Sequence, residues 1–201
     1  RAYAQAKAAQ QLLDYDDLLL AWHQLLQDDT LAAHVSARFD AVLVDEYQDT
    51  NRLQAAILQR LAPGGRGLTV VGDDAQSIYR FRAAEVGNIL GFAEAYGAAT
   101  VRLERNYRSS QPILDAATAV IHQAPEHQGK ALWTPRTGPR PQLLTVADEL
   151  AQARSVADRV LAQREEGVRL KQQAVLFRTG SHSAALELEL ARRQIPFVKY
   201  G

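Results

Sequence analysis

Two short apolar runs that each end in acidic residues constrain the fold of this chain most strongly. Residues 41–44 lead directly into Asp45 and Glu46, and residues 68–71 are followed after one glycine by Asp73. Each run is mostly apolar, with Thr69 as the one polar residue, and too short for a helix, which is typical of a buried strand in a parallel sheet. Because functional loops follow the carboxyl ends of parallel strands, the acids are predicted to lie at one edge of the sheet.

Helical patterns alternate with apolar runs along the rest of the chain. Residues 1–36 are predicted to be helical, with Asp14 as a helix N-cap and Asp17 three residues later, which favours helix-start chemistry over a site for these acids. Further helices are predicted from Asn51 to residue 62, at about 84–96, after Pro112, at about 148–164 and at 181–193, and further strands at 101–103, 143–146, 174–177 and near Phe197. The alternation predicts an α/β fold with parallel sheets flanked by helices.

Composition limits the classes of partner. Lys+Arg and Asp+Glu are both 23 among 201 residues, so the net charge is zero and any contact with nucleic acid has to be local. The chain has no cysteine, which excludes disulfides and thiolate metal sites and is compatible with a reducing cytoplasm. No apolar run approaches the roughly 18 residues that cross a bilayer. We therefore expect a soluble, cytoplasmic protein with no membrane partner.

The Asp45-Glu46 pair is the first candidate for chemistry. Two adjacent acids after a buried strand are costly unless a cation or a hydrogen-bond network compensates them. In phosphoryl-transfer enzymes an Asp at this place holds Mg²⁺, and a neighbouring acid can polarise the attacking water. The alternative for an isolated pair is a solvated strand end.

A second candidate lies after the other acidic run. Tyr79 and Phe81 are interleaved with Arg80 and Arg82. Aromatic rings and guanidinium groups together bind the bases of single-stranded nucleic acid without reading their sequence. The alternative is that both rings fill the core between helices.

Three strings carry a resemblance to a known family. DEYQDTN at 45–51, VVGDDAQSIYRFRAA at 70–84 and LERNYRSS at 103–110 occur in this order, with DYDDLL, GKALWT, AVLFRT and QIPFVKYG around them. Together they resemble the UvrD/Rep group of superfamily 1 DNA helicases over essentially the whole chain. The resemblance implies RecA-like P-loop NTPase lobes, with ATP and Mg²⁺ as cofactors and 3′ to 5′ movement on DNA. Single-stranded DNA and its junctions with duplex would be bound without sequence specificity.

The resemblance also implies roles for the residues of the acidic runs. Asp45 would hold Mg²⁺, and Glu46 would act as general base on the hydrolytic water. Gln76 would contact the γ-phosphate of ATP. Together these three residues would form the hydrolytic half of the site.

Further roles fall on the aromatic and basic residues. Tyr79 and Phe81 would stack on DNA bases, and Arg82 would link the DNA site to the nucleotide site. Tyr107 would stack on the adenine. Arg108 would be an arginine finger that reaches the γ-phosphate from the second motor domain. For the isolated string, the alternative for Arg108 is a surface ion pair with Glu104.

The chain departs from the family pattern in two places. Where the family commonly has Gly-Trp-Arg-Gly, this chain has Arg80-Phe81-Arg82-Ala83, so the stacking ring is smaller and a flexible residue is lost. The third acid of the frequent GDDD string is Ala75 here. Stacking is expected to survive the first change, and the second indicates that an acid at position 75 is not needed.

The sequence contains no phosphate-binding GxxxxGK[ST] string, and Gly129-Lys130 lacks the preceding glycines. The resemblance implies that residues 1–36 would be the helical end of an insertion subdomain, 37–103 part of the first motor domain and 104–201 part of the second, both incomplete. We expect a helicase segment that is inactive alone and needs the missing parts of its parent. The alternative is a non-catalytic module that binds single-stranded DNA or a protein.

Overall fold

The computed structural model describes residues 2–124 and 129–200, which fall into two compact units. The first unit extends to Pro141 and the second begins at Gln142. None of the described helices is long and apolar enough to cross a membrane.

Three helices open the first unit, as the sequence predicts for residues 1–36. They are α1 (Ala2–Ala9), α2 (Tyr15–Leu25) and α3 (Asp29–Ser36). Asp14 caps α2 in a capping box: its side chain accepts from the backbone N–H of Asp17, and the Asp17 side chain accepts from that of Asp14. The prediction of helix-start chemistry for these acids is confirmed.

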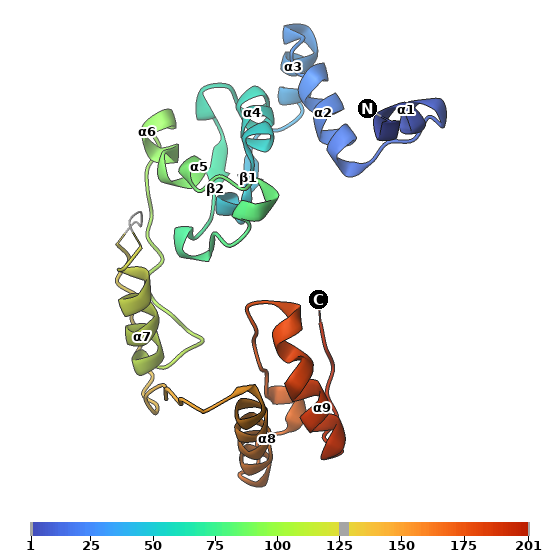
Figure 1. Ribbon diagram of the computed structural model, residues 1–201. Helices are drawn as coiled ribbons and strands as arrows, with labels where there is room; N and C mark the ends of the chain where they lie inside the picture. The colour runs from blue at the N-terminus through green and yellow to red at the C-terminus, as the bar shows by residue number, and fades with distance from the viewer. Residues whose placement is uncertain (1, 125–128, 201) are drawn as a thin grey trace. The chain divides into compact units, whose positions relative to one another are not determined.

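The predicted strand–helix–strand unit follows, but the prediction that its strands are buried is wrong, since Leu43 at the centre of the first strand is 77% exposed. Strands β1 (Val42–Val44) and β2 (Leu68–Val70) pair in parallel, with Val42 opposite Leu68 and Val44 opposite Val70. Helix α4 (Arg52–Leu61) connects them, and its first turn is closed by a capping box between Asn51 and Gln54. Figure 1 shows the two strands side by side with α4 next to them.

The apolar face of α4 forms the core of this unit. Ile57 and Leu61 pack against Leu26 and Ala32 from the preceding helices. The region predicted as one helix at 84–96 forms two short ones, α5 (Gly87–Leu90) and α6 (Phe92–Tyr96), which meet at Gly91. Phe92 packs its ring edge-to-face on Tyr47, with 5.4 Å between centroids, and this contact ties α6 to the end of β1.

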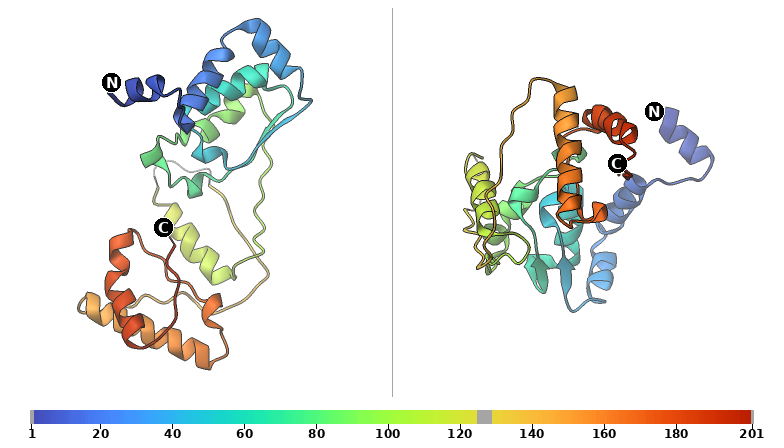
Figure 2. Two further views of the ribbon diagram at one scale, coloured as in Figure 1. Left: turned by 90° about the vertical axis from the view of Figure 1, so that its right-hand side faces the viewer. Right: turned by 90° about the horizontal axis from the view of Figure 1, so that it is seen from below.

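The first unit ends with α7 (Gln111–Ile121) and the loops on either side of it. Arg105 and Trp133 form an isolated parallel bridge between these loops. In the second unit, α8 (Glu149–Glu165) packs on α9 (Ala184–Arg192), shown in orange to red in Figure 2. The core between them consists of Ala153, Ala157, Leu186, Leu190 and Ile195.

The strands predicted at 101–103, 143–146, 174–177 and near Phe197 do not form. In the described part of the chain, β1 and β2 make the only sheet. Leu143 is 96% exposed, Leu176 93% and Val101 82%, so these apolar segments lack the covering that a buried strand has. A strand exists only where a neighbouring strand takes up its backbone hydrogen bonds, and no described segment does so here.

Candidate functional site

The carboxyl ends of β1 and β2 bring the two acidic segments together. The ladder continues beyond the strands, because Val71 N donates to Val44 O and Tyr47 N donates to Val71 O. Asp45 and Glu46 therefore lie beside the segment that begins at Gly72. This is the arrangement predicted from the two apolar runs.

Glu46 has an unusual backbone conformation. Its φ and ψ are 50° and 42°, in the left-handed region that non-glycine residues rarely occupy. The Asp45 carboxylate accepts from the Glu46 N–H at 2.9 Å, which fixes the two acids relative to each other. Both residues are exposed. Mg²⁺ keeps most of its water and takes one or two carboxylates, so this exposed pair fits such an ion.

Gln48 joins the two segments by hydrogen bonds, and the sequence alone does not single it out. Its side chain is almost fully buried, at 1% exposure. Its Nε2 donates to Glu46 Oε2 at 2.6 Å, and its Oε1 accepts from the Asp73 N–H at 2.9 Å. The only signal in the sequence was the position of a glutamine two residues after the acidic pair.

Gly72 provides the space that Gln48 needs. A Cβ atom added at Gly72 would lie 2.5 Å from Gln48 Oε1 and 2.6 Å from Ile89 Cδ1. Real Cβ contacts are essentially never this short. The glycine therefore permits the close approach of the buried amide to the backbone after β2.

Asp73 binds both Gln76, the residue predicted to contact the γ-phosphate, and Lys130. Gln76 Nε2 donates to Asp73 Oδ2 at 3.0 Å, and Lys130 Nζ lies 2.5 Å from Asp73 Oδ1 and 2.7 Å from Asp74 Oδ1. Burial alone would raise the pKa of Asp73, but the hydrogen bonds from Lys130 and Gln76 outweigh it and lower the pKa. Burial likewise opposes the charged Lys130, yet its two carboxylate partners raise its pKa.

The aromatic and basic residues after β2 gather into a small cluster. The rings of Tyr79 and Phe81 lie 6.0 Å apart, and the Arg82 guanidinium is 5.0 Å from the first and 5.5 Å from the second. Phe81 is 77% exposed, so it does not fill the core as the alternative required. Ala83, where the family commonly has glycine, is left-handed with φ 63°.

Tyr107 and Arg108 lie on the loop before α7. Asn106 Oδ1 accepts from the backbone N–H groups of Arg108 and Ser109, and Arg136 donates to the carbonyls of Tyr107 and Arg108. These bonds fix the backbone of the loop and leave the Arg108 side chain exposed. The ring of Tyr107 is 72% exposed.

Arg105, on the same loop as Tyr107, is close to two aromatic rings, one from this loop and one from the loop after α7. Its guanidinium is 5.0 Å from the Tyr107 ring and 5.4 Å from the Trp133 ring. The backbone completes the link, since Asn106 N donates to Trp133 O and Trp133 N donates to Glu104 O. Tyr107 is therefore part of an aromatic and cationic surface rather than an isolated ring.

The structure thus brings some predicted site residues together and leaves others separate. Glu46 and Gln76 belong to one hydrogen-bonded network through Gln48 and Asp73. Among the described residues, no hydrogen bond or ion pair joins Arg108 to this network or to Glu104.

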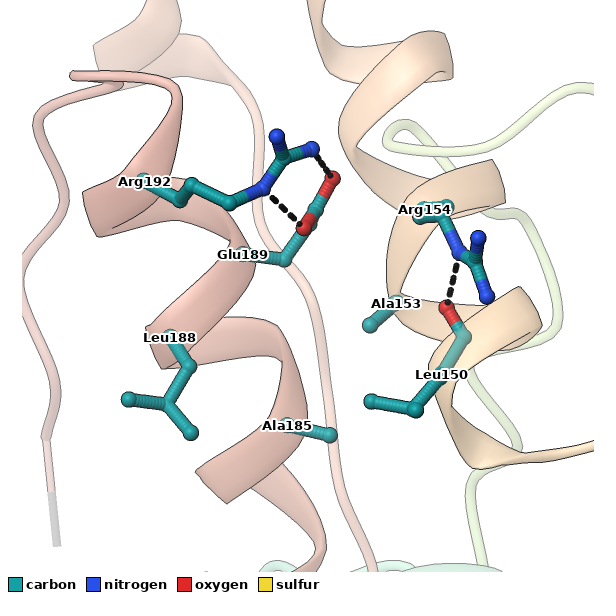
Figure 3. A pocket seen from close by; sticks show the side chains of 7 residues that line it. All are labelled: Leu150, Ala153, Arg154, Ala185, Leu188, Glu189 and Arg192. Atoms are coloured by element: carbon teal, nitrogen blue, oxygen red, sulfur yellow. Dashed lines mark hydrogen bonds and ion pairs between the residues drawn. The ribbon is translucent and has the colours of Figure 1, made fainter.

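The second unit has a cleft of its own. A cleft of about 400 Å³ lies between α8 and α9, and Figure 3 shows Arg192 holding Glu189 with two hydrogen bonds on its wall. The hydrogen bond from Arg192 lowers the pKa of Glu189 to about 2. None of the predicted site residues lines this cleft.

Comparisons with known proteins cover the whole chain. Residues 1–97 match the model of the UvrD/REP helicase N-terminal domain, and residues 101–201 match that of the UvrD-like helicase C-terminal domain. The chain is 41% identical to DNA helicase II of Salmonella typhimurium and 40% identical to DNA helicase II of Escherichia coli, each over 100% of this chain. It is 36% identical to the ATP-dependent DNA helicase PcrA of Staphylococcus epidermidis. It spans 28% of the length of each of these relatives.

Proposed function

This chain belongs to the UvrD/Rep helicase family, and on that premise we propose that it is a segment of an ATP-dependent DNA helicase. The parent would move 3′ to 5′ on single-stranded DNA and unwind duplex, in the cytoplasm. Residues 37–103 would belong to the first RecA-like motor domain and residues 104–201 to the second, after a helical piece at 1–36. The segment alone would be inactive, since its sequence contains no GxxxxGK[ST] loop.

The network at the carboxyl ends of β1 and β2 is the observation that carries this proposal. A buried amide, Gln48, holds the side chain of Glu46 with one end and the backbone of Asp73 with the other. The Asp73 carboxylate then holds Gln76. Such a network would allow a change at Glu46 to reach Gln76, as coupling between water activation and phosphate contact would require.

The acids at this edge suit hydrolysis of a phosphoanhydride. Asp45 would hold Mg²⁺ through its exposed carboxylate, and the ion would neutralise charge on the phosphates. Glu46 would take the proton of the attacking water through the carboxylate oxygen that Gln48 leaves open. Gln76 would use its side-chain amide to contact the γ-phosphate.

The cluster of Tyr79, Phe81 and Arg82 would bind single-stranded DNA and its junctions with duplex. The exposed Phe81 ring offers a face to a base, and Arg82 offers a cation close to both rings. Base stacking on an aromatic ring contributes about 1–3 kcal/mol and tolerates any sequence. The same loop follows Gln76 directly, so DNA binding and phosphate contact would share one segment.

Tyr107 and Arg108 would complete the nucleotide site from the second motor domain. The exposed Tyr107 ring would stack on the adenine, and Arg108 would stabilise charge on the γ-phosphate. Their backbone is already fixed by Asn106 and Arg136. Only the side chains would need to move when the nucleotide binds.

Glu46→Gln in the complete protein tests the proposal. Removal of the base is expected to lower kcat for ATP hydrolysis by about 10²- to 10⁴-fold, while ATP binding persists. Turnover in the presence of single-stranded DNA and equilibrium binding of a nucleotide analogue measure the two effects. Glu94→Gln, the same change at an exposed residue of α6, serves as the control. Normal turnover in Glu46→Gln would remove this residue from the chemistry.

A further inference from the structure

Lys130 makes the ion pairs that join the loop after α7 to the carboxyl end of β2. Its Nζ lies 2.5 Å from Asp73 Oδ1 and 2.7 Å from Asp74 Oδ1. The side chains are largely shielded, with exposed fractions of 22% for Lys130, 29% for Asp73 and 4% for Asp74. The lysine comes from 57 residues further along the chain than Asp73.

The other carboxylate oxygen of Asp73 holds Gln76. Oδ2 accepts from Gln76 Nε2 at 3.0 Å, while Oδ1 accepts from Lys130 and from the backbone N–H of Ala75. Because one carboxylate binds both side chains, its rotamer sets the direction in which the Gln76 amide points. Gln76 is otherwise exposed.

The charges make this arrangement depend on Lys130. Asp73 and Asp74 are adjacent, and the Asp74 side chain is almost buried. Without the ammonium group, the Asp73 carboxylate would keep the neutral donors of Ala75 and Gln76 but lose the cation that offsets its burial, which favours its rotation toward water. That rotation would release Gln76.

We propose that Lys130 is a positioning residue for ATP hydrolysis, which fixes the Gln76 amide through the Asp73 carboxylate. The inference rests on the proposed function to the extent that Gln76 contacts the γ-phosphate. Through Lys130 the loop at residues 129–134 would act on the hydrolytic edge of β1 and β2. Loss of the ion pair between Lys130 and Asp73 would leave ATP binding intact but weaken the contact of Gln76 with the γ-phosphate.

A carbodiimide cross-link tests the contact itself. The reagent joins an amine and a carboxylate that touch, with loss of water, and this chain has only four lysines. The Lys130 peptide is expected to be linked to the tryptic peptide 67–80, which contains Asp73 and Asp74. Lys7, which contacts Asp14 and Asp17 at 2.6 and 2.5 Å, is the positive control. A link at Lys7 without one at Lys130 would overturn the proposal.

Kinetics of the complete protein test the positioning role. Lys130→Gln is expected to lower kcat by about 10- to 100-fold with little change in the KM for ATP, as for a lost supporting contact. Lys130→Arg should restore most of the rate, since it keeps a cation at this place. Lys171→Gln, at an exposed lysine, is the matched control and should leave kcat unchanged.

The double variant Lys130→Gln/Gln76→Ala separates the possible failures. If Lys130 acts through Gln76, the double variant should be no slower than Gln76→Ala alone. Additive losses, or a normal rate in Lys130→Gln when Gln76→Ala is slow, would overturn the positioning role. If the cross-link forms but Gln76→Ala turns over normally, the assignment of Gln76 to the γ-phosphate fails, and with it the catalytic part of this inference.

Discussion

At the scale of single residues, Glu46 combines strain with a fixed side chain. A left-handed backbone costs a non-glycine residue about 1–2 kcal/mol, and it persists only where its surroundings determine it. Here Val71 holds the N–H of the next residue and Gln48 holds the carboxylate. Glu46 is also the proposed general base. Its backbone strain therefore occurs at the residue whose carboxylate would have to point at the attacking water.

Arg108 provides the sharpest prediction at this scale. In the complete protein, Arg108→Ala is expected to slow ATP hydrolysis by about 10³- to 10⁵-fold, because an arginine finger stabilises charge that develops on the γ-phosphate. Steady-state turnover with single-stranded DNA measures the effect. Arg164→Ala, at an exposed residue of α8, is the control. Near-normal turnover in Arg108→Ala would exclude the finger role.

The sequence predicts the acids of this site better than the residues that hold them. The positions of Asp45 and Glu46 in the site can be predicted from the sequence, because they directly follow an apolar strand. The positions of Gln48 and Lys130 cannot be predicted in this way, because both depend on contacts with Asp73. Gln48 is 25 residues from Asp73 in the sequence, and Lys130 is 57 residues from it. A buried amide or a paired lysine has no local pattern that distinguishes it from a surface residue.

At the scale of elements, helices with their own caps are predictable and unpaired strands are not. The capping boxes at Asp14 and Asn51 are local, and α2 and α4 begin at the residues after them. The sequence predicts Phe92–Tyr96 as part of one longer helix, but the structure divides that helix at Gly91. The segments at 101–103 and 174–177 have strand composition, but a ladder needs a partner that local sequence cannot supply.

The turn that ends at Ala83 gives a prediction about stability at the scale of elements. Ala83→Gly is expected to stabilise the protein by about 0.5–1 kcal/mol, because glycine adopts φ 63° without the steric cost of a Cβ. Ala117→Gly, on the exposed face of α7, should instead destabilise by about 0.5–1 kcal/mol. Chemical denaturation of the two variants measures both effects. A loss of stability in Ala83→Gly would contradict the left-handed conformation.

At the scale of the whole molecule, the unpaired apolar segments are the main feature. Val101, Leu103, Leu143 and Leu176 are all more than 80% exposed. Exposed apolar runs with strand composition mark surfaces that other protein segments cover. The chain spans 28% of the length of its relatives, and we propose that the rest of such a parent covers these runs.

Dye binding tests this proposal. The isolated 201-residue chain is expected to bind a hydrophobic fluorescent dye strongly, and the complete protein is expected to bind much less per molecule. Leu143→Gln, at a side chain that is 96% exposed, should lower dye binding by the isolated chain without unfolding it. Equal dye binding by the isolated chain and the complete protein would show that these runs stay uncovered.

The position of Trp133 beside Arg105 has an optical consequence. Trp133 is one of the two tryptophans of this chain, and its ring lies 5.4 Å from the Arg105 guanidinium, which also contacts Tyr107. A purine that stacks on Tyr107 would change the position of Arg105, and the emission of Trp133 would report it. Titration of the complete protein with ATP should therefore change its fluorescence, and the part of the change that Trp133→Phe removes should also be absent in Tyr107→Ala. If the emission of Trp133 does not change when ATP is added, the adenine does not stack on Tyr107.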